Sequence, residues 1–354
     1  MNGQNYNARR RSTFLAITKP AVLPAVGIIL AGCGRAHSAL SPVSPEAADI
    51  ARIWWIFFVV CAAVYIVVAL LVVGARWCRG NSNSTAGIPP PLKVEASQEL
   101  RTERIVLWAT VVTALILVSL LGADLWVQRG ISPRNDDPLA IRLTGHQWWW
   151  SAEYQDPNPS RVFETANEIH IPAGRSIRLI LESNDVIHSF WIPQIHGKKD
   201  LIPGHPAEIS FRVDKPGKYD GFCAEFCGYQ HAHMGLIVVA EEPAKFEQWA
   251  QAQRTEAPPS LTDSQKRGRE IFEHASCSLC HTANGTMARS RVGPILTHVA
   301  SRSMIGAGVL PNTRENLAAW LVDPQIAKPG AMMPPNELSK ADLNALLDFM
   351  ETLK

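Results

Sequence analysis

Two long apolar runs constrain this chain more than any other feature of its sequence. Residues 53–73 and residues 105–127 are almost wholly apolar, and tryptophans lie near the ends of both runs. An apolar helix of about 20 residues can cross the hydrocarbon core of a membrane, and tryptophan is enriched at membrane surfaces. The sequence therefore predicts a transmembrane helical hairpin over residues 53–127.

The charge of the segment between the two runs orients this hairpin. The segment is polar, and its basic residues are Arg76, Arg79, Lys93, Arg101 and Arg104. Because basic loops stay in the cytoplasm, both ends of the hairpin are predicted to face outward. The rest of the chain would then lie on the outer face of the membrane.

The amino terminus has the pattern of an export signal. Arg9, Arg10 and Arg11 precede a short apolar run over residues 21–30, which is too short for a comfortable permanent span. The run ends in Leu-Ala-Gly-Cys33, which resembles the cleavage and lipidation site of bacterial lipoproteins. We expect a signal peptide over residues 1–32, a lipid on Cys33 and an exported segment over 33–52. The alternative is an ordinary signal peptide whose cleavage region contains a cysteine.

The pattern of apolar and polar residues changes twice after the second apolar run. Apolar residues alternate along 207–214, and Ile177, Leu179 and Leu181 alternate likewise between turn signals, which predicts short half-buried strands. A compact β-sandwich or barrel is expected over 136–242, followed by a linker over 243–260. Helical patterns over 263–274, over 313–321 and after Ser339 then predict a small α domain over 261–354.

Charge and cysteine content narrow the function classes. The net charge of +2 gives no reason to expect a nucleic acid partner. The seven cysteines are an odd number, which argues against a purely disulfide-stapled protein. Two close pairs of cysteines instead indicate cofactor chemistry.

One cysteine pair lies in the pattern of covalent haem attachment. Cys277 and Cys280 are followed directly by His281, so both thiols can bond to the haem vinyl groups while the imidazole binds the iron. The second axial ligand of a cytochrome c is commonly Met, which raises the potential. Met333 is predicted for this position because class I cytochromes c place the ligand just before a proline; Met332 is the alternative.

The other pair opens a loop of soft metal ligands. Cys223, Cys227, His231 and Met234 lie within one short stretch, and thiolate, thioether and imidazole together favour copper. A disulfide between the two cysteines and a zinc site are the alternatives. A centre with two copper ions needs a second imidazole, and His188 at the end of an apolar strand is the candidate.

These motifs resemble subunit II of haem-copper cytochrome c oxidases, of the bacterial caa-type with a fused cytochrome c domain. The pattern Cys-x-Glu-x-Cys-Gly-x-x-His-x-x-Met matches residues 223–234, the family's second histidine segment matches 185–193, and Lys-x-Asp-x-x-Pro-Gly matches 198–204. The resemblance implies a multi-domain membrane protein. It would combine the helical hairpin, a cupredoxin-like β-sandwich for a binuclear copper A centre, and an all-α class I cytochrome c domain with one haem c.

The resemblance also implies roles for individual residues. The backbone carbonyl of Glu225 would be a weak copper ligand, and its side chain would reach a magnesium or manganese ion shared with subunit I. Trp148, in the run Gly-His-Gln-Trp-Trp-Trp, would lie where electrons enter the copper centre. The alternative for these tryptophans is packing and a membrane-surface belt. Glu103 could mark a proton-channel entrance or be a solvated acid at a helix start.

The implied function is electron transfer into a terminal oxidase. A cytochrome c, or a quinol–cytochrome c reductase complex, would reduce the haem, and electrons would pass through copper A to subunit I, where oxygen is reduced to water with proton pumping. The chain would sit in the bacterial cytoplasmic membrane among lipid and the other oxidase subunits, with its copper and haem domains on the periplasmic face. The alternative is the corresponding subunit of a copper A-containing nitric oxide reductase. A quinol oxidase subunit would lack the copper ligands, and a copper chaperone would need neither haem nor hairpin.

Overall fold

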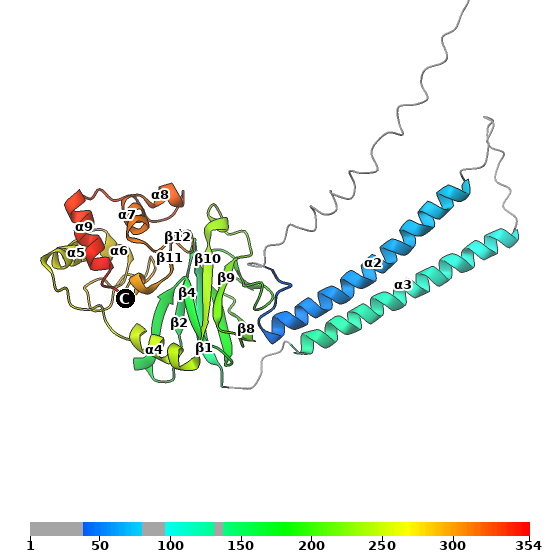
Figure 1. Ribbon diagram of the computed structural model, residues 1–354, viewed down its shortest axis with the longest axis horizontal. Coiled ribbons are helices and arrows are strands. Elements are labelled where there is room, and N and C mark those ends of the chain that lie inside the picture. Colours follow the sequence, from blue (N-terminus) through cyan, green and yellow to red (C-terminus); the bar gives the residue numbers. More distant parts are fainter. Residues whose placement is uncertain (1–37, 80–95, 131–136) are drawn as a thin grey trace, which may run out of the picture.

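The computed structural model describes residues 38–79, 96–130 and 137–354. Two long helices lead away from a head that contains a β-sandwich and a second, mostly helical domain (Figure 1). The predicted signal peptide, Cys33 and most of the predicted cytoplasmic loop lie outside the described residues, and those interpretations stay predictions.

The predicted hairpin corresponds to helices α2 (Pro45–Arg79) and α3 (Ala96–Gly130). Both contain windows of high mean hydropathy, 3.2 and 2.5, and almost none of these windows is covered by protein. At 1.5 Å per residue each helix is about 50 Å long, which exceeds the roughly 30 Å of a membrane core. The helices therefore have the length and composition of spans and continue beyond them.

The first turns of α2 are embedded in the head of the protein. Ala47 and Ala51 are buried, and Glu46 accepts a hydrogen bond from the backbone N–H of Arg212 at 3.4 Å. The hydroxyl of Ser44 donates to the carbonyl of Ile195. Within the predicted exported segment over 33–52, the chain becomes helical at Pro45 and packs on the β-sandwich.

The sandwich consists of two five-stranded mixed sheets. The first has the strand order β3-β2-β1-β5-β8 and the second β4-β10-β9-β6-β7. The pairs β1·β5 and β4·β10 are parallel, and the other pairs are antiparallel. The strands are β1 (Leu139–His146), β2 (Trp149–Tyr154), β3 (Phe163–Ala166), β4 (Glu168–Pro172), β5 (Ser176–Ser183), β6 (His188–Trp191), β7 (Lys199–Leu201), β8 (Ala207–Arg212), β9 (Gly217–Cys223) and β10 (Gly235–Glu241).

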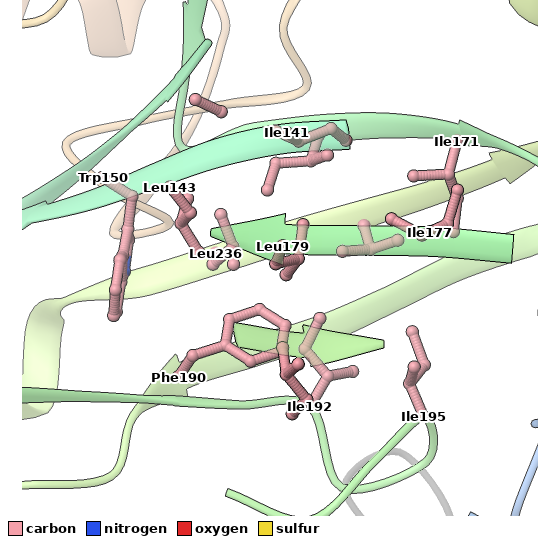
Figure 2. Close-up of a cluster of buried hydrophobic side chains, with 14 of the residues drawn as sticks. Ile141, Leu143, Trp150, Ile171, Ile177, Leu179, Phe190, Ile192, Ile195 and Leu236 are labelled. Carbon is pink, nitrogen blue, oxygen red and sulfur yellow. The ribbon is translucent and has the colours of Figure 1, made fainter. Parts of the chain in front are cut away.

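Alternating side chains from the two sheets make the core of the sandwich. Ile177, Leu179 and Leu181 on β5 are at most 1% exposed, so the predicted alternation is the buried face of a strand. They belong to one buried cluster with Phe190 and Leu236 from the second sheet, and Figure 2 shows Ile177 and Leu179 in it. Burying each such side chain contributes about 1.5–3 kcal/mol, which makes this core the main support of the domain.

The predicted linker over 243–260 is corrected in part. Its first eleven residues form helix α4 (Pro243–Gln253), because Phe246 and Ala250 find an apolar surface on the sandwich and are buried there. The ring of Trp249 packs on Tyr154 and Phe163. Only the segment after α4 is without regular structure.

The carboxyl-terminal domain is a set of short helices around a second core. The predicted helices over 263–274, over 313–321 and after Ser339 begin at the polar caps Thr262, Thr313 and Ser339, whose side-chain oxygens accept backbone N–H bonds. The helices are α5 (Asp263–His274), α6 (Cys277–Cys280), α7 (Arg314–Val322), α8 (Pro324–Ala327) and α9 (Lys340–Met350), with a small hairpin of β11 (Met304–Ile305) and β12 (Leu310–Pro311).

Helices α5 and α9 cross at a glycine. A β-carbon on Gly268 would lie 1.9 Å from the carbonyl oxygen of Ala345, which is far closer than non-bonded atoms can approach. Gly268 therefore permits the close contact that brings Phe272 and Phe349 together at 5.7 Å between ring centroids.

Polar contacts join the two domains of the head. The backbone N–H of Gly235, at the start of β10, donates to the carbonyl of Ala307 at 2.8 Å. The carboxylate of Glu168 accepts the backbone N–H of Ser303 at 3.0 Å and its hydroxyl, and also contacts His170 at 3.1 Å. Burial alone would raise the pKa of Glu168, but these hydrogen bonds outweigh it and lower the pKa to about 2.

Replacing Gly268 by Ala is expected to destabilise the carboxyl-terminal domain. The added methyl overlaps a backbone atom, which cannot swing away, so the loss should be at or above the usual 1–3 kcal/mol of overpacking. Thermal unfolding measures it. Glu270→Ala, an exposed change on the same helix, is the matched control. Equal melting temperatures for the two variants would contradict the close crossing.

The ionised carboxylate of Glu168 predicts a pH dependence of the free energy of unfolding. Because its folded pKa lies below the ordinary value of 4.5, its contribution is fully present above about pH 4.5 and is lost as pH falls through 2. The pKa difference corresponds to roughly 3 kcal/mol. The gap in unfolding free energy between wild type and Glu168→Gln should shrink by about that amount over this interval. A constant gap would show that Glu168 is not specially stabilised.

Candidate functional site

The candidate ligands meet at one end of the sandwich. Cys223 is the last residue of β9, His188 is the first residue of β6, and the loop 223–234 leads from β9 to β10. β6 and β9 pair antiparallel with Phe190 opposite Cys223, which brings the two elements to the same edge. Residues 35 positions apart are thereby placed side by side.

The predicted ligand atoms lie within contact distance. The Cys223 sulfur is 3.8 Å from His188 Nδ1 and 3.2 Å from the carbonyl oxygen of Glu225. The Cys227 sulfur is 3.6 Å from Nδ1 of His231 and 3.8 Å from Sδ of Met234. One ligand atom from each of His188, Cys223 and Cys227 lies within 4.8 Å of the others.

The two cysteines of this loop are free thiols, so the alternative of a disulfide finds no support. Both are buried. A hydrogen bond from Cys227 lowers the pKa of Cys223, and the same interaction together with burial raises the pKa of Cys227. Two buried sulfurs that cannot both ionise cheaply are suited to a cation that neutralises them.

Asp185 fixes the ring of His188. The fully buried imidazole bonds through Nε2 to Asp185 Oδ1 at 2.8 Å, which turns Nδ1 toward Cys223. A carboxylate behind a metal-binding histidine holds its orientation and tautomer in this way. Gly145 makes room for the ring, since a β-carbon there would lie 2.7 Å from His188 Cδ2.

The turn between β1 and β2 covers the other side of the loop. The indole N–H of Trp148 and the side-chain amide of Gln147 both donate to the carbonyl oxygen of Cys227, at 2.9 and 2.7 Å. Gly228 follows with a φ of 111°, and a β-carbon there would lie 3.0 Å from the Gln147 amide. Trp148 thus touches the cysteine loop directly, where its role in electron transfer was predicted.

A lysine from the other domain reaches the same turn. Nζ of Lys328 donates to the carbonyl oxygens of Trp148 at 2.7 Å and Gly306 at 3.0 Å. Burial lowers the pKa of Lys328 to about 7, and the nearby Cys227 sulfur acts in the opposite direction. Gln230, within the loop 223–234, donates to the carbonyl of Pro329. The segment around Lys328 therefore lies against the cysteine loop.

The haem-attachment motif forms the short helix α6 and its end. Nδ1 of His281 bonds to the carbonyl oxygen of Pro294 at 2.7 Å, which leaves Nε2 free for iron. Burial lowers the pKa of His281, and Arg302 acts in the same direction, so the imidazole is neutral. Gly293 allows this contact, because a β-carbon there would lie 2.6 Å from the ring.

The two candidate methionines differ in their surroundings. Met333 is half-buried against the core of the carboxyl-terminal domain, and its carbonyl accepts a hydrogen bond from Gln325 at 2.8 Å. Met332 is 74% exposed. The burial favours Met333 as the ligand that points inward.

The residues present fit both expected cofactors. The loop 223–234 with His188 offers two thiol sulfurs, two imidazoles, a thioether and a carbonyl, which is a donor set for copper. In the cytochrome c domain, two free cysteines precede a histidine whose pKa is lowered by burial. Nε of buried Arg302 has no hydrogen-bond partner among the described residues, as expected of a group that would bond to an anionic cofactor edge.

Sequence reasoning missed the residues that orient the ligands. Asp185 lies three residues before His188 and is the one partner that the local spacing could have suggested. Gln147 and Lys328 act across long sequence separations, and nothing in their own segments signals it. His233 is exposed and bonds to Gln230 at 2.6 Å, in agreement with leaving it out of the ligand set.

Replacing Asp185 by Asn is expected to weaken copper binding roughly 10- to 100-fold, because His188 loses the carboxylate that holds its ring. Copper titration of the full chain in detergent measures the affinity. Asp220→Asn, an exposed change on β9, is the control and should bind like the wild type. Equal affinities for both variants would rule out the positioning role.

Comparison with protein families gives two matches. Residues 139–241 match the family described as cytochrome c oxidase subunit II, periplasmic domain, and residues 265–354 match the cytochrome c family. The first match spans the sandwich, and the second spans the haem-attachment motif with its surrounding helices.

Individual relatives extend over the whole chain. A cytochrome c oxidase subunit 2 of Alkalihalophilus pseudofirmus is 31% identical and covers 92% of this chain and 94% of its own length. The Bacillus subtilis protein of the same name is 28% identical, with coverage of 94% and 96%. A solved structure, the periplasmic domain of subunit II of cytochrome oxidase of Bradyrhizobium japonicum, is 33% identical, covers 34% of this chain and 96% of its own, and has a TM-score of 0.32. The chain belongs to the cytochrome c oxidase subunit II family, in the form with a fused cytochrome c domain.

Proposed function

We propose that this chain is the subunit through which electrons enter a terminal haem-copper oxidase. Its carboxyl-terminal domain would accept electrons from an external cytochrome c or a quinol–cytochrome c reductase. Its β-sandwich would deliver them to subunit I, where oxygen is reduced and protons are pumped. The observation that carries the proposal is the contact between the two domains, since Lys328 bonds to Trp148 and Trp148 bonds to the carbonyl of Cys227.

The proposed roles of the residues follow from the two donor sets. His188, Cys223, Cys227, His231, Met234 and the carbonyl of Glu225 would hold the two copper ions of copper A. Cys277 and Cys280 would bond to haem c, with His281 and Met333 as axial ligands. When bound, the two cofactors supply one-electron redox centres.

The residues around the copper ligands contribute rigidity. His188 is held by Asp185 and the Cys227 carbonyl by two donors, so the ligand atoms are placed before metal arrives. A prearranged, buried ligand set limits the rearrangement that accompanies a change of charge. Fast electron exchange needs this property.

Glu225 is proposed to serve a second ion. Its backbone carbonyl faces Cys223, while its side chain is half-buried and makes no hydrogen bond or ion pair with the residues that the structure describes. A carboxylate with free oxygens next to the copper loop suits a hard cation such as magnesium or manganese at the surface shared with subunit I.

Single cysteine substitutions should separate the two centres. Cys223→Ser is expected to abolish the near-infrared band and seven-line EPR signal of copper A but keep the haem spectrum. Cys277→Ser should disturb haem attachment and keep the copper signals. Each sulfur belongs to only one of the two donor sets.

The exposed Cys61→Ser variant is the control and should keep both signals. These spectra are to be measured on the chain purified with its membrane partners. A wild-type chain that binds a single zinc ion and shows no copper signal would contradict the proposal. A co-purifying multi-span partner with two haems and a copper ion would support the assignment to an oxidase.

A further inference from the structure

One buried side chain between the two domains belongs to neither donor set. Lys328 is 3% exposed, and its Nζ lies between the carbonyl oxygens of Trp148 in the sandwich and Gly306 in the cytochrome c domain. Protonated or neutral, an amino group has N–H bonds for both acceptors. Lys328 therefore bridges the two domains with hydrogen bonds.

Trp148 and Lys328 each lead directly to a proposed cofactor site. On one side, the indole of Trp148 bonds to the carbonyl of Cys227 at 2.9 Å. On the other side, Lys328 opens the segment that reaches Met333. Gln325 holds that segment, because its side chain bonds to Gly330 at 2.7 Å and to Met333 at 2.8 Å.

The stability of the fold does not account for a lysine here. Lys328 makes no ion pair with an acid among the described residues, and its amino group is surrounded by protein. A buried amino group that has no carboxylate partner is costly, and an apolar side chain of similar length would be cheaper. The lysine instead fixes the relative position of the two domains, because it bonds to one carbonyl in each of them.

The backbone next to this bridge requires close docking. Gly235, directly after Met234, donates its N–H to the carbonyl of Ala307 at 2.8 Å. A β-carbon on Gly235 would lie 2.8 Å from that same oxygen, which is too close. Ala307 follows Gly306, so the hydrogen bond of Gly235 and the bridge of Lys328 hold the same cytochrome segment.

We infer that Lys328 is the positioning residue that locks the Met333 segment of the cytochrome c domain onto the copper loop in one docked arrangement. The inference rests on the proposed function and names how its two sites are held together. The transfer that this arrangement serves moves one electron between domains; the external donor supplies it, subunit I consumes it, and no bond or proton changes.

The test uses the assembled oxidase with Lys328→Met, and Lys340→Met as a matched control at an exposed position. Two quantities are measured: hydrogen exchange of the Gly235 amide, which reports docking, and the rate of electron equilibration between haem c and copper A after rapid reduction. Because the loss of two hydrogen bonds shifts an equilibrium by roughly 10- to 100-fold, Lys328→Met should lose Gly235 protection and slow the transfer by that order.

Two results for Lys328→Met would overturn the inference. Values for Lys328→Met that equal those of Lys340→Met overturn the inference. So does a loss of the haem or copper spectrum without a change at Gly235, because this would show a local role. If Lys328→Met does not assemble, Gly235→Ala weakens the neighbouring contact with Ala307 from the sandwich side. Slower transfer with intact spectra then supports the docked arrangement, and unchanged transfer with lost protection overturns the inference. A wild type without copper A or haem c signals refutes the proposed function, while Gly235 exchange still tests the docking.

Discussion

The arrangement of the candidate site depends on two cysteine sulfurs that are buried side by side at the edge of the sandwich. Each sulfur faces an imidazole, and neither is exposed enough to be solvated as a thiolate. Such an arrangement is poor without a cation, because buried charge must be neutralised. The rest of the domain keeps the sulfurs in place: β6 and β9 bring the elements together, Asp185 holds one ring, and the β1–β2 turn holds the Cys227 carbonyl.

Prediction from the sequence succeeded where the pattern within one continuous segment determines its structure. The apolar runs predict α2 and α3 through their length, and the alternation of Ile177, Leu179 and Leu181 predicts the buried face of β5. The spacing within the loop 223–234 and within the CxxCH motif is likewise local. In these cases the period of the chain or the reach of a side chain fixes the structure.

It failed where a tertiary surface decides. Residues 243–253 looked like a linker because their own pattern is weak, yet Phe246 finds the sandwich and a helix forms. Lys328 lies in a proline- and glycine-bearing segment whose sequence gives no sign of burial, and it is buried where the two domains meet. No local signal encodes a partner that lies 180 residues away along the chain.

The embedded first turns of α2 have a consequence for the whole assembly. Ser44, Ala47 and Ala51 are fixed within the head, and the helix continues from there without interruption through its apolar stretch. Figure 1 shows α2 running as one continuous helix from the sandwich into its apolar stretch. The start of α2 and the β-sandwich thus form one packed unit, so a displacement of this helix would be passed directly to the sandwich that contains the cysteine loop.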